Sequence, residues 1–131
     1  MADILLDTNF ILTCIKQKID FLQELIGNKL ILPKQVIKEL KKISEDKNKK
    51  SEERELAKTS LAFLEKFKDR FKEIELEKRF VDRGLELLAE KGNKEGRETI
   101  IATLDKELRR KLKGKVKFLI IVKRKKLEII N

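Results

Sequence analysis

The stretch Ile4-Leu5-Leu6-Asp7-Thr8-Asn9-Phe10 (ILLDTNF, residues 4–10) places an apolar run, an acid and a helix start in one short segment. Consecutive branched apolar residues predict a strand that is buried on both faces of a sheet. Thr8 and Asn9 are residue types that often begin helices, and residues 10–16 then have helical character. In α/β proteins, ligands bind at the edge where buried strands end, so Asp7 is the first candidate site residue.

The same alternation of short apolar strands and amphipathic helices continues along the chain. Further strands are predicted at residues 30–32, 71–76, 99–103, 116–122 and 127–130, and a polar loop at residues 44–51. Helices are predicted at residues 19–26, 35–43, 52–67, 79–91 and 106–113. This order predicts an α/β fold, a three-layer α/β/α sandwich with a central, mainly parallel sheet. The length of 131 residues predicts a single domain over residues 1–131.

The residue types that the chain lacks exclude several kinds of chemistry. It has no histidine and one cysteine, which excludes a Ser-His-Asp triad, a Cys-His pair and an ordinary zinc site. Neither of the common glycine-rich nucleotide-binding motifs is present. An enzyme of this composition works with carboxylates, lysines and hydroxyls, and carboxylate oxygens are hard ligands that favour Mg²⁺ or Mn²⁺.

The sequence also indicates where the protein works. It has no apolar run long enough to cross a membrane, and no secretory signal is visible. The single cysteine, Cys14, lies among apolar residues of a predicted helix, where it is expected to be a small buried side chain in a reducing compartment. We therefore expect a cytoplasmic protein without a membrane partner.

The net charge of +10 is concentrated near the C-terminus. Between Lys106 and Lys126 the chain has eleven basic residues and one acid, Glu107. This segment therefore carries the whole net charge of +10, and the rest of the chain has a net charge of zero. A concentrated basic segment suggests a polyanionic partner, and nucleic acid is the leading one. A solubilising surface in a lysine-rich protein is an equally good interpretation of the charge alone.

Four acids stand at the edges of predicted elements. Asp7 and Asp105 follow strands, so both lie at the carboxyl edge of the sheet if those strands are parallel neighbours. Glu39 and Asp82 stand beside the apolar stripes of their helices, away from most of the lysines. Asp7 and Asp105 each also suit a helix N-cap, Asp105 especially well, and Glu39 and Asp82 also suit ordinary positions at the boundary of an apolar face. If the four acids share a pocket, their like charges require a bound cation or protons, and a divalent cation would support phosphodiester hydrolysis without histidine.

Four segments containing these acids resemble, in order, the motifs of the PIN-domain family of nucleases. They are LLDTNF (residues 5–10), LPKQVIKEL (32–40), VDRGLELLAEKG (81–92) and TIIATLDKELRRKL (99–112). The resemblance implies that Asp7, Glu39, Asp82 and Asp105 are the catalytic, metal-coordinating acids of a Mg²⁺- or Mn²⁺-dependent endoribonuclease. It also implies that Asn9 and Thr103 orient these acids.

Two positions depart from the family pattern. Arg83 stands where some relatives have a second acid, and Leu104 stands where a polar residue is common. These two differences leave open how many metal ions bind and how fast the protein cleaves RNA. The alternative function is therefore a catalytically weak or inactive RNA-binding or ribosome-assembly factor. The helix that begins after Asp105 supplies the basic residues expected to contact phosphates near the site, Lys106, Arg109 and Arg110.

The C-terminal stretch resembles archaeal members of the ribosomal-RNA-processing branch of the family. That resemblance implies RNA, single-stranded or looped rRNA in particular, as the partner, within a ribosome precursor. VapC-type toxin ribonucleases share the same four acids, and a toxin would have an antitoxin partner. Dimers are common in the family, so a homodimer is a further expectation.

Overall fold

One twisted sheet of six strands organises the molecule, which we describe from a computed structural model covering residues 2–76, 90–92 and 94–131. The strand order is β3-β2-β1-β4-β5-β6. All neighbouring strands are parallel except β5 and β6, which are antiparallel. The strand bounds are β1 (Ala2–Leu6), β2 (Lys29–Pro33), β3 (Phe71–Ile74), β4 (Glu98–Ala102), β5 (Lys117–Val122) and β6 (Lys126–Ile130).

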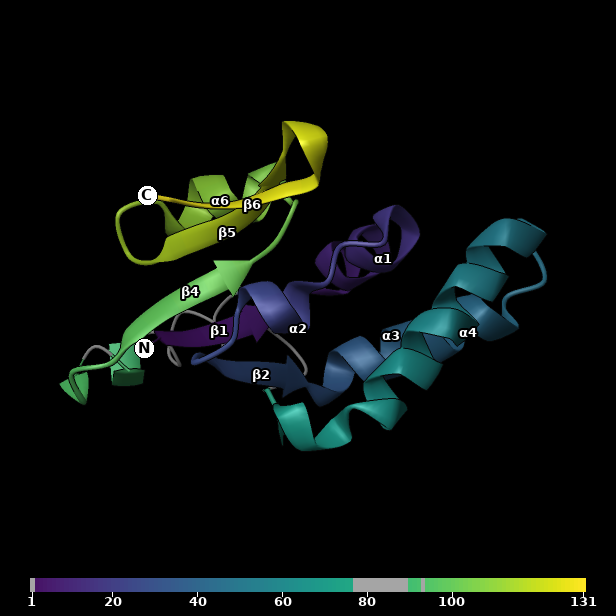
Figure 1. Ribbon diagram of the computed structural model, residues 1–131, viewed down its shortest axis with the longest axis horizontal. Coiled ribbons are helices and arrows are strands. Elements are labelled where there is room, and N and C mark those ends of the chain that lie inside the picture. The colour runs from purple at the N-terminus through teal and green to yellow at the C-terminus, as the bar shows by residue number, and fades with distance from the viewer. Residues whose placement is uncertain (1, 77–89, 93) are drawn as a thin grey trace.

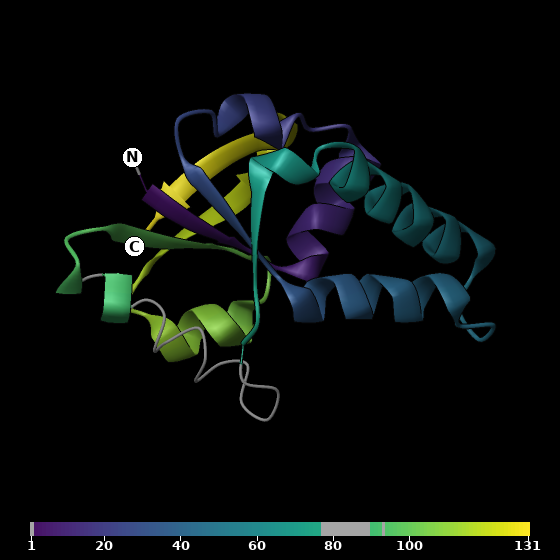
Figure 2. The same cartoon turned by 90° about the horizontal axis from the view of Figure 1, so that it is seen from below.

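Helices cover both faces of this sheet (Figures 1 and 2). Three longer helices, α1 (Thr8–Gln17), α3 (Lys34–Glu45) and α4 (Ser51–Lys66), lie together on one face, and α3 and α4 pack side by side. The helix α6 (Lys106–Leu112) lies on the opposite face. The short elements are α2 (Phe21–Glu24) and the single-turn helices η1 (Lys68–Arg70) and η2 (Lys123–Lys125). This arrangement confirms the predicted three-layer α/β/α architecture.

The alternation of side chains along the strands explains why the sheet has two apolar cores. Ile4 and Leu6 of β1 belong to the larger core, under α1 to α4, and Leu5 belongs to the smaller core, under α6. Successive residues of a strand point to opposite faces, so a strand covered on both sides must be apolar throughout. Burial of Ile4, Leu5 and Leu6 therefore follows directly from the run of apolar residues in the sequence, and Asp3 is the exception, a buried acid of β1 that binds Arg97.

Several predicted boundaries differ from those in the structure. The helix α1 begins at Thr8, because Asp7 and not Thr8 or Asn9 is its N-cap, with a carboxylate that accepts a hydrogen bond from the Thr8 N–H. The predicted helix at 19–26 is reduced to the single turn of α2. Lys18 closes α1 in a left-handed conformation (φ 58°), and Asp20 then caps the next turn. The predicted helix at 79–91 falls almost wholly outside the described residues, and Asp82 and Arg83 lie there too.

Two further predictions can be compared with the structure. Cys14 is buried, and burial together with nearby Glu24 raises the pKa of its thiol to about 12. The thiol is thus protonated and shielded at neutral pH, as expected for a structural cysteine. Within the described residues, we find no helix whose length and apolar character would let it span a bilayer.

Candidate functional site

The strand order creates a switch point between β1 and β4. From β1 the chain proceeds to β2 and β3 on one side, and it later returns to β4 and β5 on the other side. In open α/β sheets, such a point leaves a crevice beyond the carboxyl ends of the two strands, because the following connections diverge to opposite faces. Asp7 follows β1 and Thr103 follows β4, so both residues lie at this crevice.

Asp7 is fixed at the crevice by both its backbone and its side chain. Its N–H donates to the carbonyl of Ala102 at 3.0 Å, which extends the β1–β4 pairing by one step. Its Oδ1 accepts from the N–H of Thr8 at 2.9 Å, and its Oδ2 accepts from the Thr103 hydroxyl at 2.7 Å. The half-buried carboxylate is therefore held in one orientation between the start of α1 and the end of β4.

Thr103 connects Asp7 to Asp105. The fully buried Thr103 hydroxyl donates to Asp7 and accepts a hydrogen bond from the N–H of Asp105 at 3.1 Å. Asp105 in turn caps α6, with Oδ1 accepting from the N–H groups of Glu107 at 2.9 Å and Leu108 at 3.2 Å. The N-cap interpretation of Asp105 is confirmed, and its backbone is tied to the Asp7 carboxylate through one hydroxyl.

Glu39 reaches the same crevice from α3. The Thr8 hydroxyl, which is buried, donates to Glu39 Oε2 at 3.0 Å. Thr8 is the residue whose N–H binds Asp7, so the hydrogen bonds run from Glu39 through Thr8 to Asp7, and through Thr103 to Asp105. Three of the predicted acids are thereby connected although they are far apart in the sequence.

A pocket of about 90 Å³ lies beside Asp7, Thr8 and Glu39. Its walls are mostly apolar and include Leu76, from the segment that follows β3. The Gln35 side chain binds this segment at both backbone groups, because its amide donates to the Leu76 carbonyl and its Oε1 accepts from the Leu76 N–H at 3.4 Å. Gln35 thus binds the segment after β3 to the first turn of α3, beside the carboxylates of Asp7 and Glu39.

The chemistry of these side chains suits a hard divalent cation. A carboxylate offers about four lone-pair sites, so the hydrogen bonds at Asp7, Glu39 and Asp105 leave sites for a metal ion. Within residues 2–76, 90–92 and 94–131, no three acidic or cysteine side chains are close enough together to form a complete metal-binding group. The fourth predicted ligand, Asp82, lies outside these residues.

The other predicted site residues have different surroundings. Asn9 is exposed in the first turn of α1 and, within the described part of the chain, its side chain makes no hydrogen bond to the acids that it was predicted to orient. Lys106 and Arg110 are exposed, and Arg110 pairs with Glu107. Arg109 is only half-buried, but its Nε atom is buried and has no hydrogen-bond partner among the described residues.

Thr8 is the residue that the sequence interpretation missed. It was considered only as a helix start, whereas its hydroxyl binds Glu39 across 31 positions of sequence. The available signal was its place directly after Asp7, since a side chain there enters the crevice with the acid. The partner could not be anticipated, because it depends on how α3 packs against α1.

Comparisons with known proteins agree with this fold. The family model described as "PIN like domain" matches residues 4–126. No curated protein sequence matches the chain. Among solved structures, the PIN domain endonuclease Utp24 superposes with a TM-score of 0.66 at 17% identity, covering 98% of this chain and 96% of that one. VapBC2 from Rickettsia felis, bound to a DNA fragment from its promoter, superposes with a TM-score of 0.52 at 15% identity, covering 90% of this chain and 98% of the other.

Proposed function

The chain belongs to the PIN-like domain family, and from that membership we propose that it is a Mg²⁺- or Mn²⁺-dependent endoribonuclease. The observation that carries the proposal is the chain of hydrogen bonds joining Glu39, Asp7 and Asp105 at the switch point of the sheet. These hydrogen bonds hold the carboxylates of Asp7 and Glu39 and the backbone of Asp105 in fixed positions. Glu39 and Asp105 are exposed and Asp7 is half-buried, so each of these carboxylates keeps acceptor sites that a cation can reach.

In this proposal Asp7, Glu39, Asp82 and Asp105 hold the metal. A bound Mg²⁺ or Mn²⁺ supplies a water of lowered pKa and positive charge for the phosphate oxygens. Thr8 and Thr103 keep the acids in the orientation that metal binding needs, which removes part of the entropy cost of assembling the site. Lys106 and Arg110, exposed on α6 next to Asp105, contact the phosphates of the RNA, and Arg109 joins them from its half-buried position.

The proposed substrate is single-stranded or looped RNA of a ribosome precursor. The likeness to the PIN domain endonuclease Utp24 over nearly the full length of both chains supports endonuclease activity. The resemblance of the C-terminal stretch to the ribosomal-RNA-processing branch favours rRNA as the substrate. The basic segment between Lys106 and Lys126 supports a polyanionic substrate. The protein would act as one PIN-like domain in the cytoplasm, with a homodimer as the proposed assembly.

Two other functions remain as second candidates. The likeness to VapBC2 favours a toxin ribonuclease, which would be inhibited by an antitoxin and would stop growth when expressed alone. Arg83, beside Asp82, favours a catalytically weak or silent RNA-binding factor in ribosome assembly, because an arginine can take the place of part of the cation's charge. The toxin and processing functions both require cleavage, whereas the assembly function requires only binding.

Removal of the metal tests the catalytic proposal. We expect the purified protein to cleave an end-labelled, looped rRNA fragment in Mn²⁺ or Mg²⁺, to lose all cleavage in EDTA, and to recover it when Mn²⁺ is restored. Gel electrophoresis of the products measures each step. Cleavage that persists in EDTA would exclude the metal mechanism, and RNA binding without cleavage in any metal would favour the assembly factor.

Replacement of Thr103 by valine tests the role of its hydroxyl. Valine keeps the shape but removes the donor to Asp7 and the acceptor for the Asp105 N–H, so we expect cleavage to fall about 10- to 100-fold. Stability should fall by about 1 kcal/mol, because the Asp105 N–H and the Asp7 carboxylate each lose a hydrogen-bond partner. Thr103→Ser, which keeps the hydroxyl, should retain most of the activity.

The matched control for this change is Thr99→Val, at a buried threonine within β4, the strand that Thr103 follows. It should leave cleavage unchanged after correction for the folded fraction. Equal losses of activity in the two valine variants would mean that Thr103 matters only for folding.

A further inference from the structure

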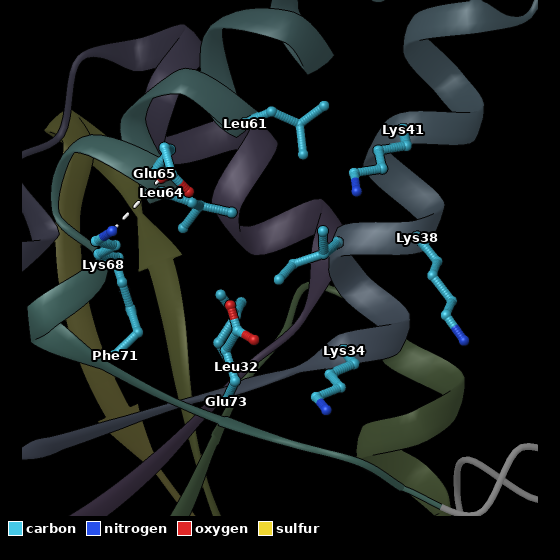
Figure 3. Close-up of a pocket in the computed structure, with 11 residues that line it drawn as sticks. Leu32, Lys34, Lys38, Lys41, Leu61, Leu64, Glu65, Lys68, Phe71 and Glu73 are labelled. Carbon is cyan, nitrogen blue, oxygen red and sulfur yellow. Dashed lines mark ion pairs between the residues drawn. The ribbon is translucent and has the colours of Figure 1, made fainter.

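A second, larger cavity lies on the other side of α3 from the carboxylate pocket. It is a groove of about 500 Å³ between α3 and α4, over the end of the sheet formed by β2 and β3 (Figure 3). Its apolar floor and walls come from Leu32, Ile37, Leu61, Leu64 and Phe71. Its charged lining residues are Lys34, Lys38, Lys41, Lys68, Glu65 and Glu73, and we call this cavity the lysine groove.

Three of these lysines form a row along one helix. Lys34, Lys38 and Lys41 are four and three positions apart on α3, which places them on a single face of the helix. Their Cα atoms are separated along the helix axis by about 6 Å and about 4.5 Å at a rise of 1.5 Å per residue. All three are exposed, and Figure 3 shows them in succession down one side of the groove. Such a row presents point charges at regular intervals to an extended anion.

The remaining charged groups leave the groove with an excess of positive charge. Lys68 stands across from the row and pairs with Glu65 at 3.8 Å, but both side chains are mostly exposed, so this pair is weak. Glu73 lies on the floor beside Leu32 (Figure 3). Four lysines against two glutamates favour an anionic occupant, and the two acids lie on the wall and floor, not in the row on α3.

The helix α3 separates the lysine groove from the carboxylate pocket by a single helix width. Gln35, Val36 and Glu39 line the pocket that contains Asp7, and Lys34 and Lys38 line the groove. Pro33 of β2 pairs with Ile74 of β3 just where α3 begins, so the first turn of α3 lies at the carboxyl ends of these two parallel strands, between the two cavities. A strand of nucleic acid that crosses the first turn of α3 therefore passes from the carboxylates into the groove.

We propose that the lysine groove binds the sugar-phosphate backbone of the RNA strand that flanks the cleaved bond. This inference rests on the proposed function and adds a binding surface separate from the basic C-terminal segment. Phosphates contact the row on α3, and bases lie over the apolar floor, where the half-buried ring of Phe71 offers a stacking surface. RNA is favoured over an acidic peptide because the groove lies only one helix width from the carboxylate pocket, on the other side of α3.

Binding of a fluorescent RNA in EDTA tests this proposal without any cleavage. The probe is a fluorescein-labelled single strand of about 12 nucleotides, followed by anisotropy over a range of salt concentrations. The groove variant carries Lys34→Gln, Lys38→Gln and Lys41→Gln. The matched control removes three lysines from the same two helices outside the groove, by Lys42→Gln, Lys58→Gln and Lys66→Gln.

We expect the groove variant to bind the probe at least about 10-fold more weakly, with the slope of log Kd against log salt reduced by about 2. This reduction follows because each phosphate contact on a single strand contributes about 0.7 to the slope. The control should change Kd by less than about threefold. A single Glu73→Gln variant should tighten binding, because it removes a negative charge from the floor.

Several results would overturn the proposal. Equal weakening in the two triple variants would show that only total charge matters, and an unchanged Kd in the groove variant would show that RNA does not enter. Binding of a fluorescent polyglutamate peptide that the groove variant alone loses, with RNA binding intact, would assign the groove to an acidic protein partner. Thermal unfolding followed by circular dichroism establishes that each variant is folded. If the triple variant is unstable, the single variant Lys38→Gln takes its place in the binding measurement.

The outcome is separable from that of the catalytic proposal. Loss of RNA binding in the groove variant, in a protein that cleaves nothing in Mn²⁺, would uphold the groove and reject the nuclease. Cleavage by the wild type, with the groove variant binding normally, would uphold the nuclease and reject the groove.

Discussion

Asp7→Asn should reduce RNA cleavage about 1000-fold while leaving the protein folded. The change removes one negative charge from the crevice but keeps an oxygen that can accept from the Thr8 N–H and so cap α1. Asparagine is also a good N-cap, so the start of α1 is preserved. The hydrogen bond from the Thr103 hydroxyl to Asp7 Oδ2 is lost, because the amide nitrogen of asparagine cannot accept it. What is lost is a charged metal ligand, and Mn²⁺ affinity, measured by titration calorimetry, should fall at least about 10-fold.

Asp20→Asn is the matched control for this prediction. Asp20 caps α2 through the N–H of Gln23 at 3.2 Å and lies away from the carboxylate pocket. The same substitution at this cap should leave cleavage and Mn²⁺ affinity unchanged. Asp105→Asn, which preserves the cap of α6, should behave like Asp7→Asn. If Asp7→Asn cleaves as fast as the wild type, the carboxylates do not form the catalytic site.

Phe21→Ala should cost about 3–5 kcal/mol of unfolding free energy, the largest stability effect that we expect from a single substitution. Phe21 is completely buried, and its ring contacts three other aromatic rings. The ring centroids lie at 6.2 Å from Phe10, 5.5 Å from Phe63 and 6.4 Å from Phe71. These rings come from α1, α4 and β3, so removal of the central ring leaves a cavity where a helix pair meets the edge of the sheet.

Urea unfolding followed by circular dichroism measures this effect. A loss of this size is a large part of the total stability of a small domain, and the midpoint of thermal unfolding should fall by more than about 10 °C. Ile26→Ala provides the contrast, because Ile26 is a large apolar residue that is 64% exposed and should change stability by less than about 0.5 kcal/mol. A cost below about 1 kcal/mol for Phe21→Ala would mean that the aromatic cluster is not part of the folded core.

Asp3 in β1 and Asp7 directly after it show that the sequence alone does not predict which acid is paired with a basic residue. Asp3 and Asp7 are four positions apart, and the side chain of Asp3 is the more buried of the two. Asp3 lies at the opposite edge of the sheet, where it accepts from the Nε of Arg97 at 2.8 Å, a bond that raises the pKa of that guanidinium. The charge of Asp3 is therefore neutralised by Arg97 at one end of the strand, whereas Asp7, at the other end, has no basic partner among the described residues. The two acids differ in the residues that contact them, which the sequence does not show.

The sequence by itself determined the layers of the fold and the positions of Asp7 and Asp105. Both follow from local rules, since an apolar run buried on both faces must be a central strand, and the residue after a parallel strand lies at the carboxyl edge. The prediction failed at the extent of α2 and at the N-cap of α1, because Lys18 and Asp7 adopt backbone conformations that the pattern of apolar residues does not encode.

Only the tertiary structure decided which side chains meet. The hydroxyl of Thr8 binds Glu39, and the hydroxyl of Thr103 binds Asp7 across 96 positions of sequence. The lysine groove likewise exists only because α4 packs against α3, which turns a row of surface lysines into one wall of a cavity. The physical reason is the same in each case: periodicity specifies the face on which a side chain lies, whereas a hydrogen bond or a groove depends on two elements whose relative placement is set by the packing of the whole core.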